Sequence, residues 1–330
     1  MLHLPPNMKI PDSMRAAAID RYGPPSVLSV HSLPVPVPSA TEVLIAVNTA
    51  GVGGWDASMR EGPSESGQER FPKVLGTDGS GTIAAVGSRV KRLHVGDRVY
   101  GYIYDNPKGG FYAQYVALPA ANVARIPAGY DLHEAGAAMV TSLTALQGVD
   151  DALELKRGET ILIHGASGAV GHLALQFAKA RGARVLATAS GKDGVTFVRR
   201  LGADLAIDGK RDDIEPVARA FAPEGIDAVL AFAGGPALTR CLSTLRRGGR
   251  VAHPNGISPV PRERRGITII AYDAEPGIRE LERLDRAWRE CRLQIPIART
   301  YTLANARRAH ERLAKGHILG KIALRVAALR

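Results

Sequence analysis

The sequence predicts an α/β fold that joins a β-rich region to a doubly wound parallel sheet. From residue 14 to about residue 127, short apolar runs alternate with glycine and proline, which is typical of antiparallel, barrel-like strands. Beyond that point helical and extended patterns alternate, as they do in a parallel sheet covered by helices. The chain has 330 residues, 45% of them hydrophobic, so it is long enough for two domains with substantial cores.

The β-rich region contains several apolar runs that we expect to form strands. Glycine-containing turns are expected at residues 87–90 and 95–99, with Gly96 and Asp97 in the tighter turn. Residues 1–13 contain three prolines and are expected to be a loose extension, so Met14 is an alternative start of the protein. The expected strands are 16–19, 43–47, 81–86, 98–104 and 111–116.

The second half is expected to alternate helices with strands. Helix 132–149 carries small and apolar residues on most faces, which predicts burial between layers. Its sheet is expected to use strands 160–164, 184–189, 204–207, 228–232, 249–252 and 267–271. The tail is expected to add helices 277–291 and 304–315 and strands 298–301 and 321–326, and to return to the first domain. The predicted domains are 1–126 with 273–330, and 127–272 as an insertion.

A glycine-rich turn follows strand 160–164 directly and opens helix 172–181. Glycines at its bends let the backbone approach a ligand and let the helix pack closely on the strand. The helix start would then direct free N–H groups and the positive end of its dipole at a phosphate. Ala166 stands where the usual pattern has its first glycine. The predicted diphosphate-binding residues are Gly165, Ala166, Ser167, Gly168, Ala169, Val170 and Gly171.

The tip of the second strand of this unit predicts which coenzyme is bound. An NAD-binding fold places Asp or Glu there to bind the ribose hydroxyls. This chain has no carboxylate at the strand tip, whereas Ser190 offers a hydrogen bond and Lys192 a cation to a 2′-phosphate. NADP(H) is therefore the predicted cofactor. The alternative is that Lys192 is an ordinary surface lysine and Asp193 contacts the ribose.

Composition argues against several other classes of function. The net charge is +11, but the arginines are dispersed and aromatic residues make up only 5% of the chain, so no specific nucleic-acid binding is predicted. No apolar run approaches the roughly 20 residues that cross a bilayer, and residues 1–13 lack a secretory core. We therefore expect a cytoplasmic protein without a membrane partner. Cys241 and Cys291 are too few for a disulfide framework and are expected to be inert packing residues.

Five segments carry a resemblance that extends from Met14 through essentially the whole chain. Through them the chain resembles the medium-chain dehydrogenase/reductase family, in its zinc-free quinone oxidoreductase branch related to zeta-crystallin. The resemblance implies a GroES-like catalytic domain, a Rossmann nucleotide-binding domain, a cleft between them and a homodimer. The matching segments are Leu75-Gly76-Thr77-Asp78-Gly79-Ser80-Gly81-Thr82, Val95-Gly96-Asp97-Arg98-Val99, Ser142-Leu143-Thr144-Ala145-Leu146, residues 164–171 and Gly316-His317-Ile318-Leu319-Gly320-Lys321-Ile322.

Zinc-dependent members of this superfamily carry a cysteine ligand within the segment that matches residues 51–56, and Gly-His-Glu where this chain has Gly76-Thr77-Asp78. Neither ligand is present, and the nine histidines lie far apart in sequence, so no metal site is expected. Alcohol dehydrogenation needs a Lewis acid to form an alkoxide. The resemblance therefore implies hydride donation to an electron-poor acceptor, a quinone or an α,β-unsaturated carbonyl compound.

The resemblance also places residues around the reacting centre. Thr144 would face the nicotinamide, Lys321 would contact the cofactor, and the segment from Gly53 to Asp56 would form the substrate side of the cleft. Trp55 would be a flat apolar wall or a core residue, and Asp56 a helix N-cap or a general acid. Relatives often have asparagine in place of Gly53 and some have tyrosine in place of Ser58, so this chain has fewer polar groups for a quinone oxygen.

Position in the sheet predicts further cofactor contacts. Ligands of open α/β sheets lie beyond the carboxyl ends of the strands, which places Phe232 and Ala233 at the nicotinamide side. Asn255 follows another strand and would bind the cofactor, or would only form a turn before Gly256.

The predicted function is NADPH-dependent, metal-free reduction of quinones or α,β-unsaturated carbonyls. Two alternatives stay open. One is a reductase of enoyl thioesters or of a biosynthetic tailoring step. The other is an NADPH-binding protein that contacts RNA without turnover, which only the basic charge favours.

Overall fold

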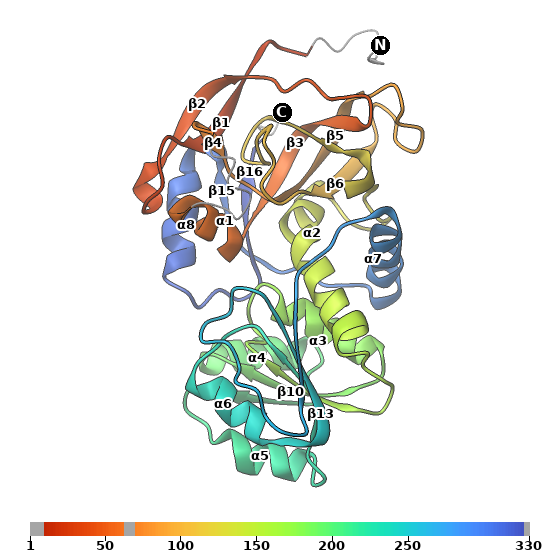
Figure 1. Cartoon of the computed structure of the whole chain (residues 1–330), viewed down its shortest axis with the longest axis vertical. Coiled ribbons are helices and arrows are strands. Elements are labelled where there is room, and N and C mark those ends of the chain that lie inside the picture. The colour runs from red at the N-terminus through yellow and green to blue at the C-terminus, as the bar shows by residue number, and fades with distance from the viewer. Residues whose placement is uncertain (1–9, 63–69, 327–330) are drawn as a thin grey trace.

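The computed structural model describes residues 10–62 and 70–326. In Figure 1 the molecule has two lobes, with the β-rich lobe above and the parallel-sheet lobe below. The first and last described strands both lie in the upper lobe, because β16 pairs there with β3 and with β15. The expected return of the tail to the first region is confirmed. The exact domain boundaries stay a prediction.

Among the described residues, the upper lobe contains a seven-stranded and a three-stranded sheet. In the large sheet the order is β15-β16-β3-β5-β6-β8, and β7 pairs with β3. The small sheet has the order β2-β1-β4. The strands are β1 (Ser13–Ile19), β2 (Leu28–Pro34), β3 (Glu42–Val52), β4 (Lys73–Val74), β5 (Asp78–Val86), β6 (Arg98–Tyr102), β7 (Tyr115–Pro119), β8 (Val123–Arg125), β15 (Ile297–Thr302) and β16 (Lys321–Arg325).

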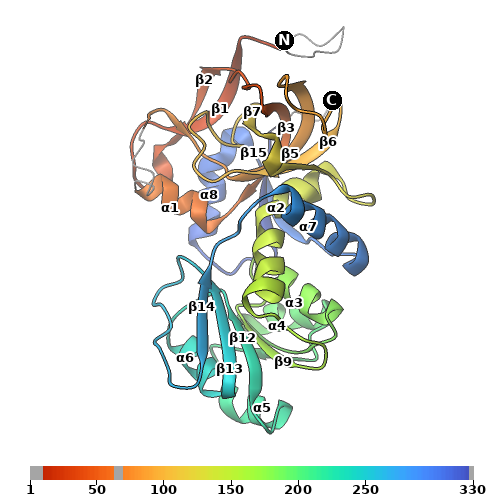
Figure 2. The ribbon, with the colours of Figure 1, turned by 45° about the vertical axis from the view of Figure 1, so that its right-hand side comes forward.

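The lower lobe contains a six-stranded parallel sheet within the described ranges, in the order β11-β10-β9-β12-β13-β14. Figure 2 shows β12, β13 and β14 side by side along one edge. This order reverses direction at β9, and ligands of such sheets bind where the order reverses. The strands are β9 (Thr160–His164), β10 (Arg184–Ala189), β11 (Leu205–Asp208), β12 (Ile226–Ala231), β13 (Leu245–Pro254) and β14 (Thr268–Tyr272).

Helices cover both faces of the parallel sheet and connect the lobes. The side chains of α2, α3, α4 and α7 pack in one apolar cluster on one face, and those of α5 and α6 pack on the other. The buried helix α2 also packs against β3, β5 and β6, so it spans both lobes, as Figure 2 shows. The helices are α1 (Gly54–Glu61), α2 (Leu132–Gln147), α3 (Gly171–Ala180), α4 (Gly191–Arg200), α5 (Ile214–Phe221), α6 (Pro236–Ser243), α7 (Ile278–Cys291) and α8 (Ala306–Ala314).

The structure confirms the expected fold and corrects some elements. The prediction of a strand at residues 111–116 is wrong, because β7 begins at Tyr115. Phe111 and Tyr112 lie buried in the preceding loop. Helix 132–149 ends at Gln147 and continues as a wider π-type turn, Gly148–Ala152. The strands β2, β4 and β8 were not expected. Residues 1–9 of the proposed extension lie outside the described residues.

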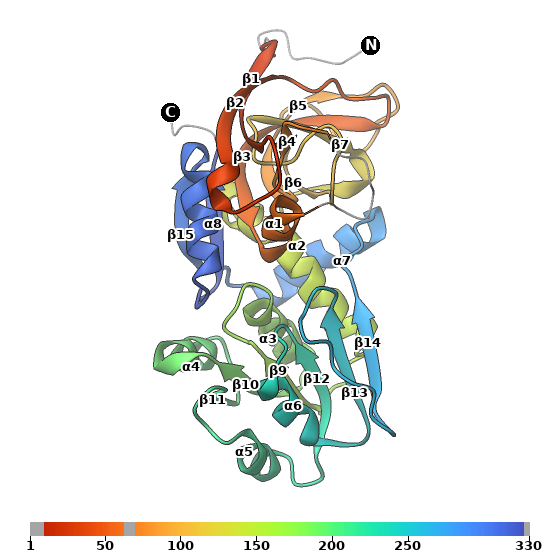
Figure 3. The ribbon, with the colours of Figure 1, turned by 60° about the vertical axis from the view of Figure 1, so that its left-hand side comes forward.

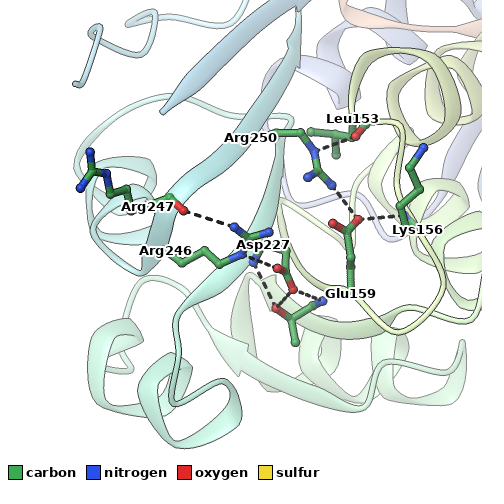
Figure 4. A network of polar contacts seen from close by, with 8 residues as sticks. Leu153, Lys156, Glu159, Asp227, Arg246, Arg247 and Arg250 are labelled. Atoms are coloured by element: carbon green, nitrogen blue, oxygen red, sulfur yellow. Dashed lines mark hydrogen bonds and ion pairs between the residues drawn. The ribbon is translucent and has the colours of Figure 1, made fainter. Parts of the chain in front are cut away.

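A charged network ties the amino-terminal edge of the parallel sheet together, on the side away from the carboxyl ends of its strands (Figure 4). One carboxylate oxygen of Asp227 accepts hydrogen bonds from the N–H and from the hydroxyl of Thr160, each at 2.7 Å. The other oxygen accepts a hydrogen bond from Arg246 Nε. Arg250 bonds to Glu159 at 2.6 Å and to the carbonyl of Leu153. Five hydrogen-bond donors thus find acceptors at this edge.

Two further expectations concern cysteines and membranes. Cys241 is buried, Cys291 is half-buried, and neither is in a disulfide. Within the described ranges, none of the helices has the length and apolar character that a bilayer crossing requires.

Candidate functional site

The glycine-rich turn lies at the carboxyl end of β9, the strand at which the sheet order reverses. Gly165 has a φ of +81°, a conformation that only glycine adopts without strain. A Cβ on Gly171 would lie 2.3 Å from the carbonyl oxygen of Gly165, so any side chain there would collide with the backbone. The predicted turn and helix start are therefore present, and α3 begins at Gly171. This cradle fits the diphosphate of a dinucleotide.

The neighbouring strand β10 holds the start of this turn in place. Thr188 pairs with His164 across the sheet, and their side chains bond at 2.8 Å. Thr188 Oγ1 also accepts the N–H of Gly165, and its carbonyl accepts the N–H of Ala166. Burial lowers the pKa of His164 to about 4, so the imidazole is neutral at neutral pH. The turn is thereby fixed before any ligand arrives.

The predicted substrate side begins where β3 meets α1. Asp56 accepts the N–H of Gly53 at 2.8 Å and the N–H of Thr77 at 3.1 Å. The first of these contacts is that of a capping box, with Gly53 as the N-cap residue and Asp56 three residues later, while a role of Asp56 as general acid stays a prediction. Trp55 is half-buried, and its indole covers Gly53 so closely that a Cβ there would lie 2.4 Å from two ring carbons. The indole therefore fills the space that a larger residue at position 53 would need.

Asp56, Asp78 and Lys321 form a buried cluster of charged groups. Lys321 opens β16 and Asp78 opens β5, the strands that flank β3, so the sheet order brings both beside the end of β3. Asp78 accepts the N–H of Val140 from α2 at 3.0 Å, while its other oxygen has no hydrogen-bond partner among the described residues. Lys321 Nζ is also buried without such a partner and lies 5.6 Å from the centre of the Trp55 ring.

Burial shifts the protonation of all three groups toward the neutral form. The pKa of Asp56 rises to about 7 through burial and through the charge of Asp78. The pKa of Asp78 rises to about 6 through burial, which Lys321 opposes. Burial lowers the pKa of Lys321, and the two carboxylates oppose that shift. The two carboxylates are therefore the opposite charges that favour the ammonium form of Lys321, although its Nζ has no hydrogen-bonding partner among the described residues.

Further polar residues behind Asp56 were not predicted from the sequence. The hydroxyl of Tyr112 bonds to Asp56 and lies 3.2 Å from His310 Nε2. Arg60 donates to His310 Nδ1 at 2.7 Å, so His310 is a neutral tautomer that donates to Tyr112. No spacing signal in the sequence linked residues 60, 112 and 310, which come from α1, the loop before β7 and α8.

The other predicted cofactor residues surround the same edge of the parallel sheet. The hydroxyl of Thr144 donates to Val140 O within α2. Phe232 follows β12, and its N–H donates to the carbonyl of His164. Asn255 lies in an exposed turn and bonds to Asp273 at 2.7 Å, while its contact with the cofactor stays a prediction. Ser190, Lys192 and Ala233 follow carboxyl ends of strands, and Lys192 and Ala233 are exposed.

Metal ligands are absent from the positions where the zinc-dependent relatives carry them. Within residues 10–62 and 70–326, no three His, Cys, Asp or Glu side chains are arranged to hold a metal ion. Residues 51–56 contain no cysteine, and Thr77, where the relatives carry histidine, donates its hydroxyl to Asp56 at 3.4 Å. The donor set at this point does not fit zinc.

Residues 39–128 match the family described as alcohol dehydrogenase GroES-like domain, and residues 169–254 match the family described as zinc-binding dehydrogenase. The chain is 31% identical over 312 residues to the quinone oxidoreductase of Lama guanicoe, across 91% of this chain and 93% of that protein.

Solved structures of related dehydrogenases share the fold of this chain. An NAD-dependent alcohol dehydrogenase is 30% identical with a TM-score of 0.88, across 95% of this chain and 100% of that one. A mycobacterial protein in complex with NADPH is 27% identical with a TM-score of 0.84, across the same shares of the two chains. The chain therefore belongs to the medium-chain dehydrogenase/reductase family, in its quinone oxidoreductase branch, and is an oxidoreductase that uses a nicotinamide cofactor.

Proposed function

We propose that the protein uses NADPH to transfer hydride directly to a quinone or an α,β-unsaturated carbonyl compound, without a metal ion. The observation that carries the proposal is the cradle between Gly165 and Gly171, where a Cβ on Gly171 would lie 2.3 Å from a backbone oxygen. Backbone that close beneath a helix start suits a diphosphate. The quinone oxidoreductase relatives support the class of acceptor.

The preference for NADPH rests on the groups beyond the tip of β10. Ser190 makes no capping bond to α4, and Lys192 is exposed, so both are available to a 2′-phosphate. Asp193 is the acidic residue in the first turn of α4. Its carboxylate accepts the N–H of Gly194 with one oxygen and bonds to His317 with the other, so both oxygens already have a partner that ribose hydroxyls would compete with.

Lys321 is assigned to the coenzyme. Its neighbour Gly320 donates its N–H to the carbonyl of Ser167 in the diphosphate-binding turn, at 3.2 Å. The buried ammonium of Lys321 therefore lies close to that turn and lacks a hydrogen-bond partner of its own. A coenzyme diphosphate would supply a hydrogen-bond acceptor for this ammonium.

The acceptor is assigned to the space beside Trp55. When bound, the coenzyme supplies hydride from C4 of its nicotinamide ring. The flat indole of Trp55 offers a wall for a ring-shaped acceptor, and its buried Nε1–H has no partner among the described residues. Asp56 shapes this wall by capping α1 and does not need to exchange a proton. Rate enhancement would then come mainly from orientation in a site that excludes water.

The test is the oxidation of NADPH by purified protein, measured with quinones, enones and enoyl thioesters in the presence of a chelator. We expect loss of the reduced-nicotinamide absorbance with quinones or enones, and weaker coenzyme binding by Lys321→Met. NADPH binding without turnover of any acceptor would contradict the proposal, and turnover of thioesters alone would favour the thioester reductase. A homodimer and a cytoplasmic location stay predictions, which light scattering and cell fractionation test.

A further inference from the structure

The segment that connects α8 to β16 lies against the cofactor edge of the parallel sheet. Its Gly320 bonds to Ser167, and His317 Nε2 lies 2.9 Å from a carboxylate oxygen of Asp193 at the start of α4. In Figure 3 the chain below α8 descends toward α4. The upper lobe thus contributes a side chain to the edge where the coenzyme is proposed to bind.

This connecting segment is held in a defined conformation. Arg312 donates to the carbonyl of Gly316 at 2.7 Å and to the carbonyl of His317 at 2.9 Å. His317 has a φ of +49°, in the left-handed region that non-glycine residues seldom adopt. A Cβ on Gly191 would lie 3.5 Å from His317 Cε1, so the imidazole packs against the first turn of α4. The contact with Asp193 is therefore supported from both sides.

The contact occupies a carboxylate that would otherwise face the ribose. Asp193 is the third residue of α4 and follows the tip of β10 closely, where a carboxylate favours the free hydroxyls of NADH and repels the 2′-phosphate of NADPH. Its other oxygen accepts the N–H of Gly194 at 2.9 Å. The hydrogen bond from His317 keeps the pKa of Asp193 below its usual value.

A second carboxylate beside the start of α4 already has partners. Asp208 ends β11, is 7% exposed, and accepts the N–H groups of Gly191 and Lys210. It is therefore committed to backbone groups, and Asp193 is the carboxylate whose availability depends on a side chain from the other lobe.

We propose that His317 sets the coenzyme preference, by engaging Asp193 and so leaving Ser190 and Lys192 to meet the 2′-phosphate. This inference rests on the proposed use of NADPH and adds a specificity-determining residue from the catalytic lobe. Without His317, the carboxylate of Asp193 is free to bind the ribose hydroxyls of NADH and to repel the phosphate of NADPH.

The experiment measures the dissociation constants of NADPH and NADH by calorimetry for the wild type, His317→Ala, Asp193→Asn and the double variant. We expect His317→Ala to weaken NADPH binding about tenfold, a change of about 1.4 kcal/mol, and to leave NADH binding unchanged or tighter. In the Asp193→Asn background the same substitution should change NADPH binding less than about threefold. His94→Ala is the control, because His94 is an exposed histidine paired with Asp97 in the β-rich lobe.

Three results would overturn the inference. A wild type that prefers NADH removes the selectivity that His317 is proposed to set. Equal weakening of both coenzymes by His317→Ala, in both backgrounds, would mean that the segment only supports the fold. Either result leaves a nicotinamide-dependent reductase intact, whereas a wild type that binds neither coenzyme would defeat the proposed function as well.

Discussion

Gly53 and Trp55 provide a sharp test of how the substrate side of the cleft is built. We predict that Gly53→Ala destabilises the protein when Trp55 is present and does not when Trp55 is replaced by valine. The backbone at Gly53 has φ −131° and ψ +169°, which alanine adopts without strain. Any loss of stability in Gly53→Ala must therefore come from contact between the new methyl group and the indole of Trp55.

The magnitude follows from the contact distances. A Cβ at position 53 would lie 2.4 Å from Cε2 and from Cζ2 of Trp55, whereas carbon atoms in contact are about 3.5–4.0 Å apart. Relief requires the indole to move by more than about 1 Å, and overpacking of this kind costs about 1–3 kcal/mol. Replacing glycine where the backbone permits it stabilises a protein by about 0.4–1 kcal/mol through the unfolded state. The substitution should thus change sign between the two backgrounds.

The measurement is a double-mutant cycle in urea, followed by far-ultraviolet circular dichroism so that the loss of a tryptophan does not alter the signal. We expect a coupling free energy of about 1–3 kcal/mol between positions 53 and 55. Gly54→Ala is the matched control, since nothing lies within 4 Å of a Cβ at that position. If Gly53→Ala were equally destabilising with and without Trp55, the indole would not be the obstacle and the reasoning would fail.

Coenzyme binding, the network at the amino-terminal edge of the sheet and the protonation of Asp56 can each be tested separately. Gly171→Ala should weaken coenzyme binding by more than about tenfold in calorimetric titration, and Gly168→Ala should do so less, because the nearest atom to its Cβ lies at 3.3 Å. Asp227→Ala should lower the free energy of unfolding by about 2–4 kcal/mol in urea, yet leave coenzyme affinity unchanged, since its contacts lie at the opposite edge of the sheet. The pKa of Asp56 is raised to about 7, so the folded state keeps a proton that the unfolded chain loses near pH 4. Wild-type stability should therefore fall relative to Asp56→Asn as pH rises from 5 to 7, by up to about 1.4 kcal/mol per pH unit, and a relative increase would contradict the shift.

Local signals predicted the parallel sheet well. The run Ile161-Leu162-Ile163 is apolar on both faces, as a strand between two helical layers requires, and β9 and β10 begin and end where the sequence indicated. The prediction of a strand at residues 111–116 was wrong for a physical reason. Its aromatic rings are buried because Gly76 and Gly79 let them approach the backbone, so hydrophobicity there indicates burial without strand pairing.

The candidate site was only partly predictable. The residues of the glycine-rich turn are consecutive in the sequence, so a local motif was enough to predict it. The cluster of Asp56, Asp78 and Lys321 depends instead on the order β16-β3-β5, which places the start of the last strand of the chain beside an early one. No periodicity in the sequence specifies that order. Asp78 and Lys321 stood within segments that carried the family resemblance, but their mutual proximity and burial required the fold.

The start of β16 connects the two lobes at the candidate site. Lys321 enters the carboxylate cluster of the upper lobe, while the preceding residues, Gly320 and His317, contact the diphosphate turn and the start of α4 in the lower lobe. A coenzyme bound at that edge would therefore change the electrostatic surroundings of Asp78 and Asp56 through Lys321, which already opposes the rise of both pKa values. Substitutions in this short segment should alter coenzyme binding, whereas substitutions at Arg60 or His310, behind Asp56, should act first on stability.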